Sequence, residues 1–453
     1  MKHNKYRKLT LLSAAVMLAA MAPLAQAQQT RNLTLNEAIE LSIKNSGQLK
    51  VSKAKVDEAV AAARDAWNNH LPDFKVSGTY MRLDNPDVDL KVKLGGSSSG
   101  GGTGSGSSSS PSDIKVNEAE YGIANLSLPI FSGLRIKYGA ESAKYLEEAV
   151  KLDAQGDRED VILNTISAYN NLFKAQQTVS IVNENLNREK QRVTDFGNLE
   201  QNGLMARNDL LKAELQQSNV ELSLMDAENN LKLTIINMDL LLGLPEDTKL
   251  VPDSASLSGT PDAGSIADWE QKAMQNRKDM AALAYREKAA ATNIRAIRGE
   301  YYPGVAVAGG YIAANIPNLL TVTNALNASV ALQYNVGTLW KTGAKVRQAK
   351  ARYDQLEANE GLLHDRIRLE TNQAFENYLL ALRKITVYQK AVEQANENYR
   401  ITKNKFDNNL VNTTDLLDAD VAQLQAQMNY TFSKTDAMTA YKKLEQTTGI
   451  LNN

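Results

Sequence analysis

The sequence predicts a mainly α-helical fold with a small β part, in which long helical hairpins occur twice. Three observations support this prediction: very long proline-free segments with helical periodicity, shorter segments with strand periodicity, and an internal repeat. An offset of 206 positions, without a gap, places Ala168 on Ala374 and Gly243 on Gly449. The chain is therefore a tandem duplication, and we expect the same architecture in both halves.

The upstream segments follow a second offset, of 231 positions, which places Asn45 on Asn276 and Pro72 on Pro303. Because the two offsets differ, the first copy carries an insertion between Pro72 and Ala143. A Gly/Ser-rich stretch at 95–111 accounts for most of it. Such a low-complexity composition is typical of a flexible loop.

The N-terminus has the pattern of a secretory signal peptide, which we assign to residues 1–27. Basic residues precede an apolar run from Leu9 to Ala22, and Ala25-Gln26-Ala27 matches a small-residue cleavage site. This run is shorter than the ~20 residues that a membrane-spanning helix needs. No later run approaches that length, so we expect an exported protein that is either soluble or held in a membrane by strands.

Composition argues against several classes of function. The net charge of −1 gives no attraction to nucleic acid, and the absence of cysteine removes disulfides and thiolate chemistry. The histidines His3, His70 and His364 have no second ligand or base at a motif spacing. We therefore predict no enzyme activity, no catalytic or metal site and no cofactor.

The first repeat is expected over residues 28–244. Thr34 and Glu37 have the spacing of a capping box that opens a short helix, and a second, Ala-rich helix follows. Alternation of apolar and polar residues predicts strands, and longer 4-3 spacing predicts helices. In chain order we expect strands over about 74–83 and 121–131, separated by the loop 95–111, then long helices over about 133–197 and 209–242.

The first long helix carries an apolar stripe in sustained 4-3 spacing, which is typical of helices that supercoil and pack knobs-into-holes. At 1.5 Å per residue, a helix of ~60 residues is about 90 Å long, far beyond an ordinary globular helix. The stripe contains Val161, Thr165, Ala168, Leu172, Ala175, Val179, Val182, Leu186, Val193 and Phe196.

The second repeat is expected over 266–453, after a Pro-, Ser- and Gly-rich linker at 245–265. It begins with a helix pair over roughly 266–300. Strands over about 305–312 and 328–336 then precede long helices over about 343–405 and 415–449. The last of these carries Leu417, Val421, Leu424, Met428, Thr431, Thr435 and Met438 in 4-3 spacing.

The four predicted strands cannot complete a barrel alone. A barrel in a membrane has to close, because each unpaired backbone group in lipid costs several kcal/mol. Two chains would supply eight strands and three would supply twelve. The helices carry a second set of apolar positions, including Leu211, Leu215 and Leu222, which suits a cylinder of neighbours. An isolated antiparallel coiled coil is the alternative that the pattern alone leaves open.

Several short motifs, in this order and occurring twice, make the chain resemble the outer-membrane efflux protein family typified by TolC. They include the segment Leu33–Ile39, the Leu71-Pro72 and Tyr302-Pro303 junctions, and Leu128-Pro129-Ile130-Phe131-Ser132-Gly133. The turn sequences that begin at Asn202 and Thr414 also match. The resemblance covers nearly the whole chain after the signal peptide.

The resemblance implies a homotrimer in the cell outer membrane. Twelve strands would form a shared transmembrane β-barrel, with residues such as Leu126, Val330 and Tyr334 facing lipid, and twelve helices would form an α-helical barrel in the periplasm. The partners would be a periplasmic adaptor protein and an inner-membrane pump, and exported small molecules or proteins would pass through. The expected function is the exit duct of a tripartite efflux pump or a type I secretion system.

The family also implies a pore constriction at the periplasmic tip, where Asp415 and Asp418 match two acidic residues one helical turn apart. Three chains would bring six carboxylates into one ring. Two carboxylates about 6 Å apart repel by roughly 0.7 kcal/mol in water and by nearly 3 kcal/mol at an effective dielectric constant of 20. The ring should favour cations. Alternatively, Asp415 is a helix N-cap and Asp418 complements the helix dipole.

In the family, a Tyr and an Arg on one tip turn bind a Thr-Asp pair on the neighbouring turn. The matching tip contacts here are Phe406 and Val411 opposite Asn208 and Asp209. Phe lacks the hydroxyl group and Val lacks the charge, so a different latch is expected, with Arg207 and Lys405 as nearby candidates. The tip turns are predicted at Gly203 and Asn409, since both residue types tolerate left-handed backbone.

A soluble periplasmic coiled-coil adaptor or scaffold is the rival function. The predicted strand pairs and the lack of a lipid-anchoring cysteine argue against it. The exported cargo is not encoded in an obvious motif, because a wide aqueous tunnel imposes few residue constraints.

Overall fold

The computed structural model describes residues 30–84, 116–246, 248–253, 261–317 and 319–451. The predicted signal peptide and the Gly/Ser loop 95–111 lie outside these residues. The described chain forms two compact units, and each draws on both sequence repeats. Unit 1 comprises Met1–Ser52, Ala154–Lys278 and His364–Asn453, and unit 2 comprises Lys53–Asp153 and Asp279–Leu363. The long helices contribute residues to both units. The boundary between the two compact units therefore does not coincide with the boundary between the two sequence repeats.

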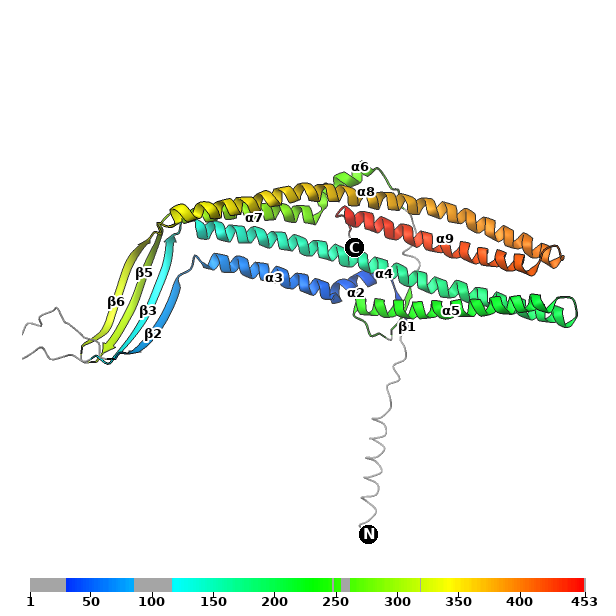
Figure 1. Ribbon diagram of the computed structural model, residues 1–453, viewed down its shortest axis with the longest axis horizontal. Helices are drawn as coiled ribbons and strands as arrows, with labels where there is room; N and C mark the ends of the chain where they lie inside the picture. Colours follow the sequence, from blue (N-terminus) through cyan, green and yellow to red (C-terminus); the bar gives the residue numbers. More distant parts are fainter. Residues whose placement is uncertain (1–29, 85–115, 247, 254–260, 318, 452–453) are drawn as a thin grey trace, which may run out of the picture. The chain divides into compact units, whose positions relative to one another are not determined.

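Helices dominate the described chain (Figure 1). The first half contains α2 (Leu35–Asn45), α3 (Gly47–Asn68), α4 (Arg135–Gln201) and α5 (Arg207–Leu242). The second half contains α6 (Ile266–Asn276), α7 (Lys278–Arg298), a short 3₁₀ helix (Gly299–Tyr301), α8 (Thr338–Asp407) and α9 (Thr413–Thr447). Among the described helices, none combines the length and the apolar character needed to cross a membrane.

Unit 2 contains one antiparallel sheet, in the order β2-β3-β5-β6. Its strands are β2 (Asp73–Arg82), β3 (Glu118–Phe131), β5 (Gly304–Ile316) and β6 (Leu320–Gln333). The strands of the second half extend beyond the predicted spans 305–312 and 328–336, and residues 334–336 lie outside β6. The polar residues Asn315 and Thr321, which interrupt the apolar alternation, are nevertheless paired with each other.

The register of the sheet places apolar side chains from all four strands on one face. Phe74 lies opposite Leu126, and Leu128 lies opposite Val307, which in turn lies opposite Val330. Because side chains alternate between faces, the intervening positions lie on the other face, which consists mostly of polar and small residues. The apolar face is exposed in the single chain, with Phe74 at 65%, Val330 at 73% and Leu326 at 83% exposure.

The turn from β3 into α4 depends on a close approach of two glycines. Gly133 has φ +65°, and a Cβ atom there would lie 2.1 Å from the carbonyl oxygen of Gly299. A Cβ atom on Gly299 would lie 2.5 Å from the carbonyl oxygen of Gly133. The left-handed backbone and the mutual contact both require glycine at this junction.

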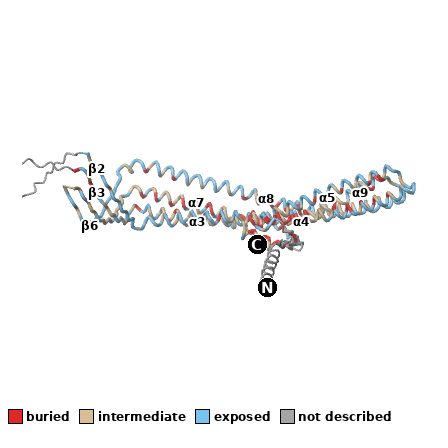
Figure 2. Tube along the Cα trace, turned by 90° about the horizontal axis from the view of Figure 1, so that it is seen from below, coloured by how far each residue is buried: buried red, intermediate tan, exposed pale blue. Residues whose placement is uncertain are grey.

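Unit 1 contains two apolar clusters whose residues are related by the 206-position offset of the sequence repeat. Tyr169, Leu172 and Met238 belong to one apolar cluster, formed by α2, α4 and α5. Phe375, Tyr378 and Leu444 occupy the equivalent positions of a second cluster, formed by α6, α8 and α9. Of the predicted stripe of α4, Val179 and Val193 are half-buried and the other residues are buried. Figure 2 colours the buried positions of the chain red, and several lie near the label of α4.

The stripe predicted for the last helix is less accurate. In α9 the most deeply buried apolar residues include Leu416, Ala437 and Leu444, whereas Val421 of the predicted stripe is 46% exposed. Of the predicted stripe, Thr435 is buried and the remaining positions apart from Val421 are half-buried. Several of the buried positions are small residues such as Ala437, which hydrophobicity alone does not distinguish.

The predicted linker 245–265 contains a strand. Within it, β4 (Lys249–Pro252) pairs in parallel with β1 (Thr30–Leu33). Leu33 and Leu250 are fully buried, and the Tyr169 hydroxyl group contacts the carbonyl oxygens of Leu33 and Asp253, each at 2.9 Å. Burial of two leucines and pairing with a distant segment therefore override the loop-like composition.

Thr34 caps α2 as predicted, accepting a hydrogen bond from the backbone N–H of Glu37 at 3.2 Å. The reciprocal half of the capping box differs from the prediction. The Glu37 carboxylate forms an ion pair with Arg31.

Candidate functional site

Two helical turns carry most of the predicted site residues. Gly203, between α4 and α5, has φ +72°, and Asn409, between α8 and α9, has φ +58°. The turns are closed alike: the N–H of Leu204 donates to Leu199 O, and the N–H of Leu410 donates to Lys405 O, both at 2.8 Å. Both turns therefore use a left-handed residue, and Asn supplies it where glycine is absent.

The two aspartates of the predicted constriction lie in the first turn and a half of α9, and both are exposed. The prediction that Asp415 is the N-cap is wrong, because the helix begins two residues earlier and Asn412 caps it. Asn412 Oδ1 accepts from the Asp415 N–H at 3.0 Å, and the Asp415 carboxylate accepts from the Asn412 N–H at 3.2 Å. This is a complete capping box, which fixes the position of Asp415.

The predicted tip contacts differ in whether they stay within one hairpin or join the two hairpins. Asp209 forms an ion pair with Lys212 at 3.4 Å in its own helix. Neighbouring Arg207, one of the candidate latch residues, lies 3.7 Å from Glu200 of the same hairpin. By contrast, Phe406 of α8 stacks on Phe196 of α4, with ring centroids 5.4 Å apart.

An apolar cluster thus joins the two hairpins near their turns, and sequence reasoning missed it. We call it the tip cluster. Its buried members are Phe196, Leu210, Ala213 and Leu416, with Val193, Met205, Tyr399 and Phe406 packed against them. Phe406 and Phe196 provide an aromatic contact between the two hairpins.

A buried group of charges lies beside the tip cluster. Arg192 Nη1 donates to Glu189 Oε1 at 2.6 Å, and Arg192 Nη2 lies 3.4 Å from Asp420 Oδ1 and 3.3 Å from the Tyr399 hydroxyl group. We call Glu189, Arg192 and Asp420 the buried ion cluster, since their exposures are 0%, 8% and 1%. Burial and the neighbouring Asp420 raise the pKa of Glu189 to about 7.

One feature of the sequence could have indicated the buried ion cluster. Glu189 falls between Leu186 and Val193 at the spacing of the apolar stripe, so a carboxylate occupies a core position. A charge at such a position needs a buried partner, but the partner on α9 is far away in sequence.

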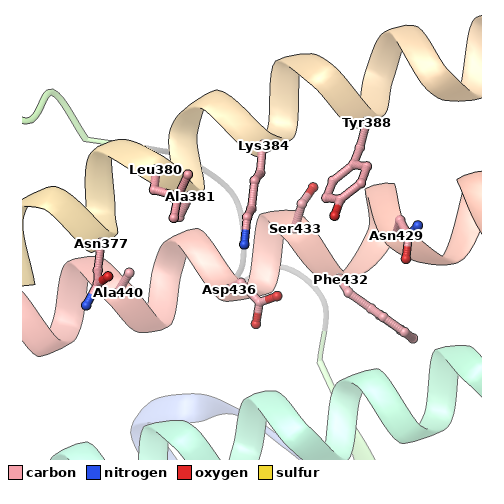
Figure 3. A pocket seen from close by; sticks show the side chains of 10 residues that line it. All are labelled: Asn377, Leu380, Ala381, Lys384, Tyr388, Asn429, Phe432, Ser433, Asp436 and Ala440. Carbon is pink, nitrogen blue, oxygen red and sulfur yellow. The ribbon is translucent and has the colours of Figure 1, made fainter.

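Two further polar contacts connect α4 with α9 farther from the turns. Lys174 forms an ion pair with Asp436, and Asn170 Nδ2 donates to Thr439 Oγ1 at 2.6 Å. Asp436 also lines a groove of about 320 Å³ between α8 and α9, into which Lys384 extends (Figure 3). The two hairpins are therefore tied at several levels.

Among the described residues, no group of three or more His, Cys, Asp or Glu side chains is arranged to hold a metal ion.

Comparison with known proteins identifies the class. The family model for outer membrane efflux proteins matches residues 38–244 and 269–450. The chain therefore belongs to the outer membrane efflux protein family, and this membership assigns it to the outer membrane. It does not support the alternative of a soluble periplasmic adaptor.

Individual proteins are similar to this chain in sequence or in fold. The outer membrane efflux protein BepC of Brucella suis is 23% identical over 376 residues, covering 81% of this chain and 74% of that protein. The Campylobacter jejuni CmeC outer membrane channel has a TM-score of 0.76 at 16% identity, covering 92% of this chain and 86% of that one. For VceC of Vibrio cholerae the TM-score is 0.73 at 18% identity, with 92% and 96% covered.

Proposed function

We propose that this chain is one subunit of a homotrimeric outer-membrane exit duct, serving a tripartite efflux pump or a type I secretion system. The observation that carries the proposal is the sheet of unit 2. It has one continuous apolar face, and its outer strands β2 and β6 each pair on one side only within the described chain. Twelve strands from three copies would close the sheet and leave its apolar face toward lipid.

Exposed apolar positions on the helices support assembly as well. Leu215, Leu222 and Met225 of α5 are between 60% and 64% exposed in the single chain. They repeat along one helix, as expected for a seam that a neighbouring helix covers. Three copies of the hairpins would form a cylinder in which these seams meet.

The duct would act passively. An inner-membrane pump would supply the energy, and a periplasmic adaptor would hand over small molecules or proteins. The tip would be its gate, with Asp415 and Asp418 from three chains forming an acidic constriction. Both aspartates are exposed in the single chain, which leaves them available to such a ring. The capping contacts of Asp415 are compatible with this role, because an accepted hydrogen bond leaves its charge in place.

Two adjacent substitutions in β6 test the proposal. Leu326 lies on the apolar face, and Asn327 lies on the opposite face. At a barrel midplane, Lys on the lipid face costs about 2–4 kcal/mol, whereas Lys on the lumen face is tolerated. Leu326→Lys should therefore reduce the amount of assembled protein in outer-membrane fractions, and Asn327→Lys should not.

The matched pair distinguishes the duct from a soluble protein. For a soluble adaptor, the wild type would remain in the periplasmic fraction and the two lysines would have similar effects. That outcome would refute the proposed function.

A further inference from the structure

The buried ion cluster has an excess of acceptors. Glu189 Oε2 and both carboxylate oxygens of Asp420 accept no hydrogen bond in the described chain. The two carboxyl groups face the same guanidinium group, since Arg192 contacts Glu189 at 2.6 Å and Asp420 at 3.4 Å, and Asp420 contributes to the raised pKa of Glu189. Arg192 supplies the one positive charge that contacts these carboxylates, because the buried Nε and Nη2 atoms of neighbouring Arg188 form no hydrogen bond in the described chain. The fully ionised cluster of Glu189, Arg192 and Asp420 therefore has a net charge of −1 away from water.

One proton resolves this excess. If Glu189 Oε2 carries it, the O–H group can donate to Asp420, while Glu189 Oε1 still accepts from Arg192. Asp420 then remains the single carboxylate that faces the single guanidinium group. A buried pair of this kind is stable only when charges and hydrogen bonds are matched.

The cluster connects elements that are distant in sequence. Glu189 and Arg192 belong to α4, Asp420 belongs to α9, and Tyr399 of α8 contacts Arg192. From α5, the residues packed at the adjacent levels of α4 are apolar, Ala213 and Val220. Any change in the charge of the cluster therefore acts on the contact between the two hairpins.

We propose that the buried ion cluster is a proton-sensitive latch: a proton shared by Glu189 and Asp420 holds α4 against α9, and its loss separates the hairpins at their turns. The separation of the helices is a property of the chain itself. Its consequence, a more open duct at higher pH, rests on the function proposed above.

The direction of the pH dependence follows from linkage. The pKa of Glu189 rises from an ordinary 4.5 to about 7 in the folded chain, so the latched state binds the proton more tightly than the unfolded chain does. The stabilisation of the latched state is fully present below about pH 4.5, and it is lost progressively as the pH rises to about 7. Above that value Glu189 is charged, and the penalty is constant.

A distance measurement tests the latch without reference to transport. The chain has no cysteine, so spin labels can be attached specifically at Thr194→Cys on α4 and Ala422→Cys on α9, both exposed positions. In the full chain in detergent, we expect one short distance near pH 5. A second, longer distance should appear as the pH rises from 5 to about 7, and its share should not increase further between pH 7 and 8.

Two variants remove the titration in different ways. Glu189→Gln keeps a neutral donor toward Asp420, and Asp420→Asn supplies a donor while Glu189 stays paired with Arg192. Both should keep the short distance throughout the range. Glu184→Gln, which changes an exposed carboxylate of the same helix, should behave like the wild type. If Glu189→Gln does not fold, as judged by circular dichroism, Asp420→Asn provides the test.

The latch is refuted if the wild-type distance is constant from about pH 5 to 8, or if both cluster variants shift like the wild type. Conductance of the same proteins in planar bilayers is a separate measurement. A distance that shifts without any conductance would preserve the latch and contradict the duct.

Discussion

The tip cluster leads to a quantitative prediction about gating, for which Phe406→Ala is the informative change. Replacing a fully buried Phe by Ala costs about 3–5 kcal/mol. Phe406 is half-buried, so roughly half of that applies, and loss of the stacked pair with Phe196 adds about 0.5–1.5 kcal/mol. The closed arrangement should therefore lose about 2–4 kcal/mol.

If opening breaks this contact, that loss multiplies the open-to-closed ratio of each subunit by about 30 to 900. Single-channel recording of the purified protein, without adaptor, measures the ratio directly. We expect Phe406→Ala to spend far more time in conducting states, whereas Phe406→Leu, which retains most of the volume, should show a smaller increase.

Val387→Ala is the matched control, since Val387 lies on the same helix and is 63% exposed. It should leave the recordings unchanged. Equal behaviour of Phe406→Ala and Val387→Ala would refute the idea that the tip cluster holds the duct closed.

Two further predictions concern the turns and the junction. The double substitution of Asp415 and Asp418 by Asn should lower the preference for cations in bilayer recordings, because it removes the acidic ring; unchanged selectivity would leave Asp415 with its capping role alone. Gly133→Ala should destabilise the folded protein by at least about 2 kcal/mol, because its Cβ atom would lie 2.1 Å from a carbonyl oxygen in left-handed backbone. Gly139→Ala, with nothing within 4 Å of the added atom, should be neutral or slightly stabilising in thermal unfolding, and similar effects of the two would contradict the argument.

The parts of the fold that could be predicted from the sequence are those that depend on local periodicity. The stripe from Val161 to Phe196 has large side chains at regular spacing, so the buried face of α4 was evident. The strands were evident from alternation, although β6 begins at Leu320, well before the predicted start. The face of α9 was harder to predict, because Ala and Thr are buried there beside Leu.

The contacts that define the candidate site could not be predicted, because they join residues about 200 positions apart. Nothing near Phe196 indicates that its partner is Phe406, and nothing near Arg192 indicates Asp420. The family resemblance identified the right turns, but Phe406 and Val411 departed from its pattern. The structure supplies a different connection, through stacked aromatic rings and a buried charge group.

The account depends most on the incompleteness of the single chain, and native mass spectrometry of the protein extracted from outer membranes tests this directly. The predicted result is a complex of three identical subunits. A monomer that stays folded and soluble after the detergent is removed would contradict the account, because its four-stranded sheet would then have to expose its apolar face and its edges to water.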